Sequence, residues 1–452
     1  MSQTAELPAV EVSPVAETQP ASGDISRLAE HLFRHEAGKL VSVLTGIFGI
    51  HRLQMAEDVV QEALIRALKT WPYYGIPKNP AAWLTQTAKN LALDLVRREK
   101  NFQEKESQIV AFIEQGTVDS DDAPSFDDEI KDGRLRLMFA CCHPLIPQEA
   151  QTALALKTLC GFSPAEIAKA FLTTEAAIAK RLTRARQKIQ ELRIAFEIPS
   201  GEELAGRLDT VLQTLYLLFN EGYKASSGEN LVREDLCFEA IRLAGLLAEH
   251  PVGNLPRTHA LLALMLLNAA RLRARVDMDG NMLRLKEQDR SRWNGAMIGA
   301  GIQHLAQSAA GQELSEYHLQ AGIAACHCAA RDYESTDWPQ ILELYDRLVE
   351  IDDSPVVALN RSVAIGQVHG PAAGIDAVAA IRNCGSLDSY YLLYAVLAEF
   401  ETQLGNFPAA ASHLRKAMQL TEVKAEQTLL AGRLRDCERN TAGPGFQNSV
   451  FP

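Results

Sequence analysis

Hydrophobic and polar positions along this chain recur mainly with the period of an α-helix. Residues 56–70 are strongly amphipathic, and residues 81–100 carry a second apolar stripe at positions 84, 88, 91 and 95. Between them lies WPYYGIPKNP (71–80), whose three prolines and one glycine are typical of a loop. The pattern therefore predicts a helical module over residues 24–100, in which this loop joins two helices.

Residues 133–193 predict a second helical module that contains a helix-turn-helix. Ser163 is a good N-cap, Pro164 suits the first helical position, and Glu166 completes a capping box. Thr174 can cap a longer helix, in which four apolar residues form one stripe: Ile178, Leu182, Ala185 and Ile189. Lys and Arg residues lie off that stripe, as in a helix that reads the major groove. Two packed helices with a solvated basic face would give the same pattern.

Helical periodicity continues through residues 200–445, which contain a weak repeat. Trp338, Pro371 and Phe407 occupy equivalent positions at spacings of 33 and 36, close to the period of about 34 in tetratricopeptide (TPR) proteins. Stacked TPR-like hairpins build a concave binding surface, whereas a plain helical bundle needs no partner. Because Ala and Leu are abundant and β-branched runs are scarce, we expect the whole chain to be all-α.

Charge divides the chain of 452 residues further. Its 45 Lys and Arg against 57 Asp and Glu give a net charge of −12, which excludes a protein that coats nucleic acid along its whole length. Residues 24–100 are net +3 and residues 130–193 are net +6, whereas residues 194–452 are net −10. Two mildly basic modules therefore precede a large acidic domain. Basic clusters are typical of phosphate binding, although solvated helix faces produce them too.

Two segments are predicted to lack stable structure. Residues 1–23 contain three prolines and no basic residue, so we expect a disordered tail. Residues 101–132 form an acidic linker, in which aspartates crowd around Pro124. The linker is either a plain spacer or an acidic strand that mimics nucleic acid in a basic channel.

The sequence predicts a soluble, cytoplasmic protein with no membrane partner. The first 25 residues contain no apolar core that would indicate a signal peptide. The longest apolar stretch, Ala260–Leu267, is far shorter than the ~20 residues that a membrane helix needs.

Enzyme-like and metal-binding patterns are weak in this sequence. The two clusters of cysteine and histidine have gaps shorter than zinc ligands usually require, so we expect buried side chains and no metal: Cys141, Cys142 and His143, and Cys326, His327 and Cys328. The polar stretch Asn220–Lys224 could line a site, but a loop after a helix explains it as well. A P-loop, a dinucleotide fingerprint and a nucleophile elbow are all missing, so we predict neither an enzyme nor a cofactor.

Three motifs together carry a resemblance to a known family. DVVQEALIRAL, NPAAWLTQTAKNLALDLVRRE and the helix-turn-helix ending KRLTRARQKI resemble the extracytoplasmic-function (ECF) class of sigma factors, in the expected order. The stretch DGRLRLMFACCHP (132–144) resembles a subgroup with a large C-terminal helical extension. The resemblance implies that residues 24–100 are a sigma-2 domain, which binds the promoter −10 element. It implies that residues 133–193 are a sigma-4 domain, which binds the −35 element, and that the linker enters the polymerase channel.

The same resemblance assigns candidate site residues. Contact with core RNA polymerase is implied for Asp58, Gln61 and Glu62. Recognition of the −10 element is implied for Asn79, the polar reader of the loop, and for Lys89, Asn90, Arg97 and Arg98, which would contact phosphates and the melted strand. Recognition of the −35 element is implied for Glu175, Ala176, Ala177, Lys180, Arg181 and Arg184. Four aromatic residues could stack on unpaired bases or fill the core, and we expect the core for the last of them: Trp71, Tyr73, Tyr74 and Trp83.

The expected function is transcription initiation, with core RNA polymerase and promoter DNA as partners. The acidic extension would contact the basic modules and regulate them, and it could bind a regulatory protein or a ligand. We favour a required, positioning role over inhibition. A stand-alone helix-turn-helix regulator with a TPR-like sensor is the alternative, and it would bind duplex DNA without polymerase.

Overall fold

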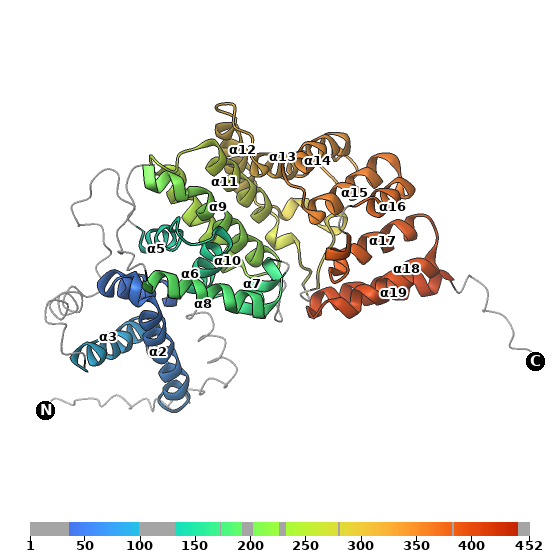
Figure 1. Cartoon of the computed structure of the whole chain (residues 1–452). Coiled ribbons are helices and arrows are strands. Elements are labelled where there is room, and N and C mark those ends of the chain that lie inside the picture. The colour runs from blue at the N-terminus through green and yellow to red at the C-terminus, as the bar shows by residue number, and fades with distance from the viewer. Residues whose placement is uncertain are drawn as a thin grey trace, which may run out of the picture. The chain divides into compact units, whose positions relative to one another are not determined.

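The computed structural model describes residues 36–98, 132–171, 173–191, 202–225, 232–278, 281–381 and 384–441 (Figure 1). Within these ranges the chain is helical, and its one β-bridge pairs Val276 with Met282. The prediction of an all-α fold is therefore confirmed. In the same ranges no helix is long and apolar enough to cross a membrane. The predicted tail and most of the predicted acidic linker lie outside the described residues.

The chain divides into two compact units, Met1–Val118 and Asp119–Pro452. The first unit contains a helix at residues 36–48, a short 3-10 helix η1 (Ile50–Arg52), α2 (Leu53–Tyr74) and α3 (Pro80–Arg98). Helices α2 and α3 pack together around buried side chains that include Phe48, Trp71 and Leu84.

The loop that joins α2 and α3 is shorter than predicted. Helix α2 continues through Trp71 and Pro72 to Tyr74, and only Gly75 at φ 82° ends it. Burial of the Trp71 indole stabilises this last turn, and the Gly75 N–H donates to the Trp71 carbonyl at 3.0 Å. Pro72 has no N–H to donate to the carbonyl of the preceding turn, so packing of Trp71 prevails over the loss of one helical hydrogen bond.

The described part of the second unit begins with the predicted module that contains the helix-turn-helix, formed by its last two helices. Its helices are α5 (Gly133–Cys141), α6 (Gln148–Cys160), α7 (Pro164–Ala170) and α8 (Glu175–Glu191). The capping box is confirmed, because Ser163 Oγ accepts from the Glu166 N–H at 3.2 Å and Glu166 Oε2 accepts from the Ser163 N–H at 2.7 Å. Thr174 caps α8 as predicted, accepting from the Ala177 N–H at 3.3 Å. The predicted apolar stripe of α8 is buried.

Eleven further α-helices follow in the described part of this unit. They are α9 (Glu202–Tyr223), α10 (Glu234–Glu249), α11 (Pro256–Ala269), α12 (Gly295–Ser308), α13 (Glu316–Ala329), α14 (Trp338–Ile351), α15 (Pro355–His369), α16 (Pro371–Ala379), α17 (Tyr391–Gln403), α18 (Phe407–Leu420) and α19 (Lys424–Thr441). Consecutive helices from α13 to α19 pack against each other (Figure 1).

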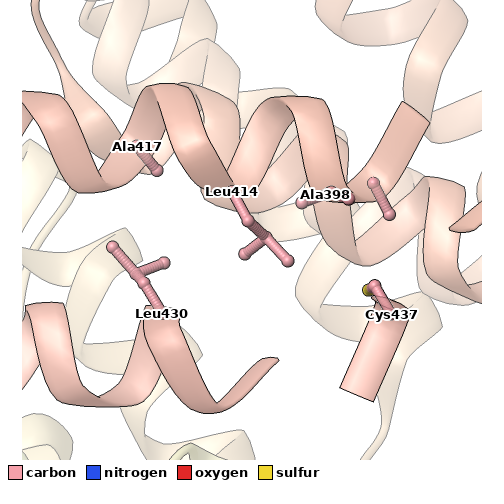
Figure 2. Close-up of a cluster of buried hydrophobic side chains, with 7 residues drawn as sticks. Ala398, Leu414, Ala417, Leu430 and Cys437 are labelled. Carbon is pink, nitrogen blue, oxygen red and sulfur yellow. The ribbon is translucent and has the colours of Figure 1, made fainter. Parts of the chain in front are cut away.

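The three positions predicted to be equivalent are the first residues of alternate helices: Trp338 begins α14, Pro371 begins α16 and Phe407 begins α18. Small residues lie where α18 meets its neighbours. Ala417 and Leu414 of α18 pack with Ala398 of α17 and Leu430 of α19 (Figure 2). The hairpin arrangement matches the expected architecture, and its assignment to the TPR family stays a prediction.

Helix α6 joins the helix-turn-helix to the extension. Ten of its residues are buried, on every side of the helix, because α5, α7 and α8 cover part of it and α9 covers another part. A helix that is apolar all round needs neighbours all round. Residues 133–191 and the extension, which the sequence analysis treated as separate domains, therefore fold as one compact unit.

Candidate functional site

The outer face of α8 is open to solvent among the described residues of the second unit. Glu175, Ala176, Lys180 and Arg184 are exposed, and Ala177 is half-buried. Within the described residues, Lys180 and Arg184 form no salt bridge, and they lie one turn apart on the same face. Two free cations on an exposed helix can reach phosphates or base edges.

Arg181 differs from the other predicted −35 residues because it is already engaged. Its guanidinium forms a 2.7 Å salt bridge with Glu149 at the start of α6, and its side chain is one-third exposed. This contact links the recognition helix to the helix that supports it, so Arg181 orients α8 in addition to any DNA contact.

The predicted polymerase-binding residues lie on one exposed face of α2. Asp58, Gln61 and Glu62 are all exposed. Ile65 and Leu68 continue the same face and are 42% and 44% exposed. Apolar side chains on an outer face beside carboxylates are typical of a protein-binding surface. The sequence analysis did not assign these two residues to the site. Their spacing places them on that face, because Ile65 follows Glu62 by three positions and Leu68 follows Gln61 by seven.

Asn79 has a structural role that the sequence analysis did not foresee. Its Oδ1 accepts from the Ala82 N–H at 3.0 Å, and its carbonyl accepts from the Trp83 N–H at 3.2 Å. Asn79 therefore caps α3, with Pro80 at the first helical position. Its side chain is exposed, so its amide N–H₂ group still faces solvent.

Lys89 is a correction to the expectations for α3. The side chain was expected to leave the apolar stripe and face phosphates, but it is only 7% exposed, and burial lowers its pKa. Position 89 directly follows the buried Ala88, so the lysine stem packs into the wide apolar face. Asn90 is exposed, as expected, and accepts from Gln86 Nε2 at 3.1 Å. The side chains of Arg97 and Arg98 lie outside the described residues.

The four aromatic residues near the loop divide into two groups. Trp71 is buried, and Trp83 packs against it edge to face with ring centroids 5.6 Å apart, so both contribute to the core. Tyr73 and Tyr74 are almost fully exposed on the last turn of α2. Of the four, only the tyrosines present rings that an unpaired base could reach.

Charged contacts hold the helix-turn-helix to the extension, and the sequence analysis identified none of them. Arg134 of α5 forms a 2.6 Å salt bridge with Glu239 of α10, and both side chains are largely buried. Arg242 of α10 binds Glu239 with two hydrogen bonds of 2.8 Å and also binds Asp132 at 2.8 Å. Asp132 in turn caps α5. Burial raises the pKa of Glu239, but hydrogen bonds and charge from Arg242 and Arg134 outweigh it and lower the pKa overall.

A second contact lies at the start of α7. Arg233, just before α10, donates to Glu166 at 2.9 Å and to Glu221 of α9 at 2.8 Å. Glu166 also belongs to the capping box, so one carboxylate both begins α7 and anchors it to the extension. Arg207 of α9 adds a buried hydrogen bond of 3.2 Å to the Phe139 carbonyl of α5. The helices that support α8 are thus tied to the extension on two sides.

The cysteines near the helix-turn-helix are packing residues. Cys141, Cys142 and Cys160 are buried, and burial raises the pKa of both Cys142 and Cys160 to about 12. Buried thiols act as small hydrophobic packing groups. In the described ranges no group of three His, Cys, Asp or Glu side chains is arranged to hold a metal ion.

Comparisons with known proteins find matches to three parts of the chain. Residues 32–102 match the model of sigma-70 region 2, and residues 136–189 match that of sigma-70 region 4. Residues 207–309 match a family of unknown function, DUF6596. The chain is 38% identical over 395 residues to "Uncharacterized protein R00370" of Rhizobium meliloti (strain 1021), covering 84% of this chain and 90% of the relative. No solved structure matches.

Proposed function

Two segments of this chain match sigma-70 regions 2 and 4, and on that basis we propose that it is a sigma factor, which directs core RNA polymerase to promoters under the control of its own C-terminal helical domain. Sigma factors are non-enzymatic proteins that bind RNA polymerase and promoter DNA. One observation supports the control by the C-terminal domain: sigma-4 is folded into the same unit as the extension, while the DNA-facing side of α8 remains exposed.

Binding of core polymerase is assigned to the exposed face of α2. Asp58 and Glu62 supply negative charge one helical turn apart, and Ile65 and Leu68 supply apolar area beside them. Carboxylates steer a basic partner and fix its register, while apolar side chains supply the contact that excludes water. Gln61 completes the face.

Promoter binding is assigned to other predicted site residues of the two sigma modules. Asn79 and Asn90, with Arg97 and Arg98, serve the −10 element, and Asn79 reads a base with the amide group that capping leaves free. Lys180 and Arg184 are the principal −35 residues, because both are exposed and neither is held in a salt bridge within the described part of α8 and its neighbours.

The extension acts as a scaffold that fixes the orientation of sigma-4. Covering α8 would inhibit DNA binding, but the extension contacts α5, α6 and the start of α7. Truncation near residue 200 would strip α9 from α6 and expose a helix that is buried on all sides, so a truncated chain tests folding as well as control. Substitutions at the contacts between sigma-4 and the extension are the cleaner test.

The polymerase assignment is tested by charge reversal in the full-length chain. We expect Asp58→Lys with Glu62→Lys to abolish binding to purified core polymerase in a pull-down or anisotropy assay, and to leave the circular dichroism spectrum unchanged. Glu343→Lys is the matched control, since Glu343 is an exposed helical glutamate in α14. Full polymerase affinity in the double variant would refute the assignment. Tight binding to duplex DNA in the absence of polymerase would favour the stand-alone regulator instead.

A further inference from the structure

The extension contains an open cavity of about 620 Å³ that no part of the proposed function uses. Residues of α9, α11, α13, α14 and α15 line it, together with residues of the segments 271–275 and 282–288. Its volume lies within the range of about 300–1,000 Å³ typical of small-molecule sites. Ala170, the last residue of α7 in sigma-4, forms part of its wall. The cavity therefore touches both the extension and the helix-turn-helix.

Two arginines concentrate positive charge at one end of the cavity. The guanidinium of the buried Arg275 stacks on the Tyr223 ring, 3.8 Å from its centroid, and donates to the Tyr223 carbonyl. Arg271 donates from Nε to the Tyr223 hydroxyl at 2.7 Å and from Nη2 to Asn268 Oδ1 at 3.1 Å. These contacts fix both guanidinium groups in place before any ligand arrives.

Neither arginine forms a salt bridge within the described residues of this unit. Buried charges in proteins are normally paired, because an unpaired charge away from water is costly. Burial lowers the pKa of Arg275, and the positive charge of Arg271 lowers it further. The arrangement thus holds two cations close together, where a single anion would stabilise both.

His327 extends the same end of the cavity. Burial, with the charges of Arg271 and Arg290, lowers the pKa of its imidazole to about 3, so the ring is neutral at physiological pH. Its Nδ1 is buried and has no hydrogen-bond partner among the described residues. A buried ring nitrogen without a partner among the described residues, close to Arg271, is available to a polar ligand group.

The opposite end of the cavity is acidic. Glu316 and Asp352 line it, and burial together with Asp352 raises the pKa of Glu316. Glu316 and His327 lie on the same helix, α13, eleven residues apart, which corresponds to about 16 Å. The two carboxyl groups can accept hydrogen bonds from hydroxyl or amino groups of a ligand.

We infer that this cavity binds a small organic anion, whose carboxylate or phosphate group lies between Arg271 and Arg275 and whose hydrogen-bond donors face Glu316 and Asp352. Guanidinium groups bind both kinds of anion through paired hydrogen bonds. Since Ala170 of α7 lines the cavity, an occupied cavity would also brace sigma-4 against the extension, a consequence that rests on the proposed function. Ligand binding itself does not depend on it.

The experiment measures binding to the full-length protein without polymerase or DNA, so its result is independent of the proposed function. Inorganic phosphate and glutamate are titrated in separate arms by calorimetry, and each is checked by its effect on thermal unfolding. We expect saturable binding in at least one arm. Preference for phosphate would identify a phosphate ester as the ligand class, and preference for glutamate would identify a carboxylate.

The variants compare two neighbouring arginines. Arg271→Gln should weaken binding at least tenfold, because it removes a charged hydrogen-bond donor, whereas Arg273→Gln should not change it, since Arg273 is exposed. Arg271→Lys keeps the charge but loses the paired geometry, so it should weaken binding less than Arg271→Gln and serves if the glutamine variant does not fold. Failure of both probes to bind, or equal affinity in Arg271→Gln and Arg273→Gln, would overturn the inference.

Discussion

Replacing Glu239 by Gln tests whether sigma-4 and the extension are energetically one unit. Glu239 is the carboxylate that both Arg134 and Arg242 bind, and the substitution keeps its size while it removes its charge. The Arg134 side chain is only 6% exposed, so its charge would lose an ionised partner in a buried position. Removing one partner of a buried pair costs about 3–5 kcal/mol, and we expect about 3 kcal/mol because Gln still accepts a hydrogen bond. Arg242 is more exposed and adds little.

Hydrogen exchange in the full-length protein is the suitable assay, since it reports on α6 directly. A loss of about 3 kcal/mol corresponds to exchange roughly 100-fold faster in peptides that cover α6, provided that α6 opens together with the contact. Glu438→Gln is the control, because the Arg415–Glu438 pair has a similar distance of 2.7 Å but is about half exposed. Exposed pairs contribute under about 1 kcal/mol, and α6 should not respond. If Glu239→Gln changed α6 exchange no more than Glu438→Gln does, the contact would not hold the two parts together.

Three further predictions follow from named contacts. Lys180→Ala and Arg184→Ala should each weaken promoter binding by the holoenzyme in anisotropy titrations. Loss of a phosphate contact should reduce the salt slope by about one unit, whereas loss of a base contact should cost ~1–3 kcal/mol on the correct sequence only. Unchanged affinity in both variants would reject α8 as the helix that reads the promoter. Asn79→Asp retains the α3 cap but loses the amide donor, so it should impair transcription from a duplex promoter about as much as Asn79→Ala; normal transcription by the Asp variant would leave capping as the only role of Asn79. Because the pKa of Glu239 is lowered in the folded protein, its contribution to stability should be complete above the ordinary carboxyl pKa of about 4.3 and should fade as pH falls through the lower folded value. Urea unfolding of the wild type at several pH values should show this loss of stability at acid pH. An equal loss of stability in Glu239→Gln would exclude Glu239 as its source.

Local features of the fold were predictable because neighbouring residues determine them. The capping box at Ser163 and the buried stripe of α8 depend on residues three or four positions apart, so periodicity is enough to find them. The predicted end of α2 was wrong because burial of Trp71, which depends on tertiary packing, prevails over the helix-breaking effect of Pro72. Lys89 was misplaced for a related reason, since a stripe drawn from four positions underestimates the width of a buried face.

Contacts between distant segments could not be read from periodicity. Arg134 and Glu239 are 105 positions apart, and the arginines of the cavity meet side chains from several helices. One indication was present in the sequence, because α6 carries apolar or small residues on all sides and therefore required more neighbours than three helices supply. From that pattern one could have predicted that a further helix packs against α6, and therefore that sigma-4 and the extension fold together.

Transcription in vitro tests the central claim most directly. Core RNA polymerase is combined with the full-length protein and fragmented genomic DNA, and the 5′ ends of the transcripts are sequenced. The account predicts new start sites that share two conserved upstream elements, near −10 and −35, and that disappear with Asp58→Lys and Glu62→Lys. Transcripts identical to those of core polymerase alone would contradict it.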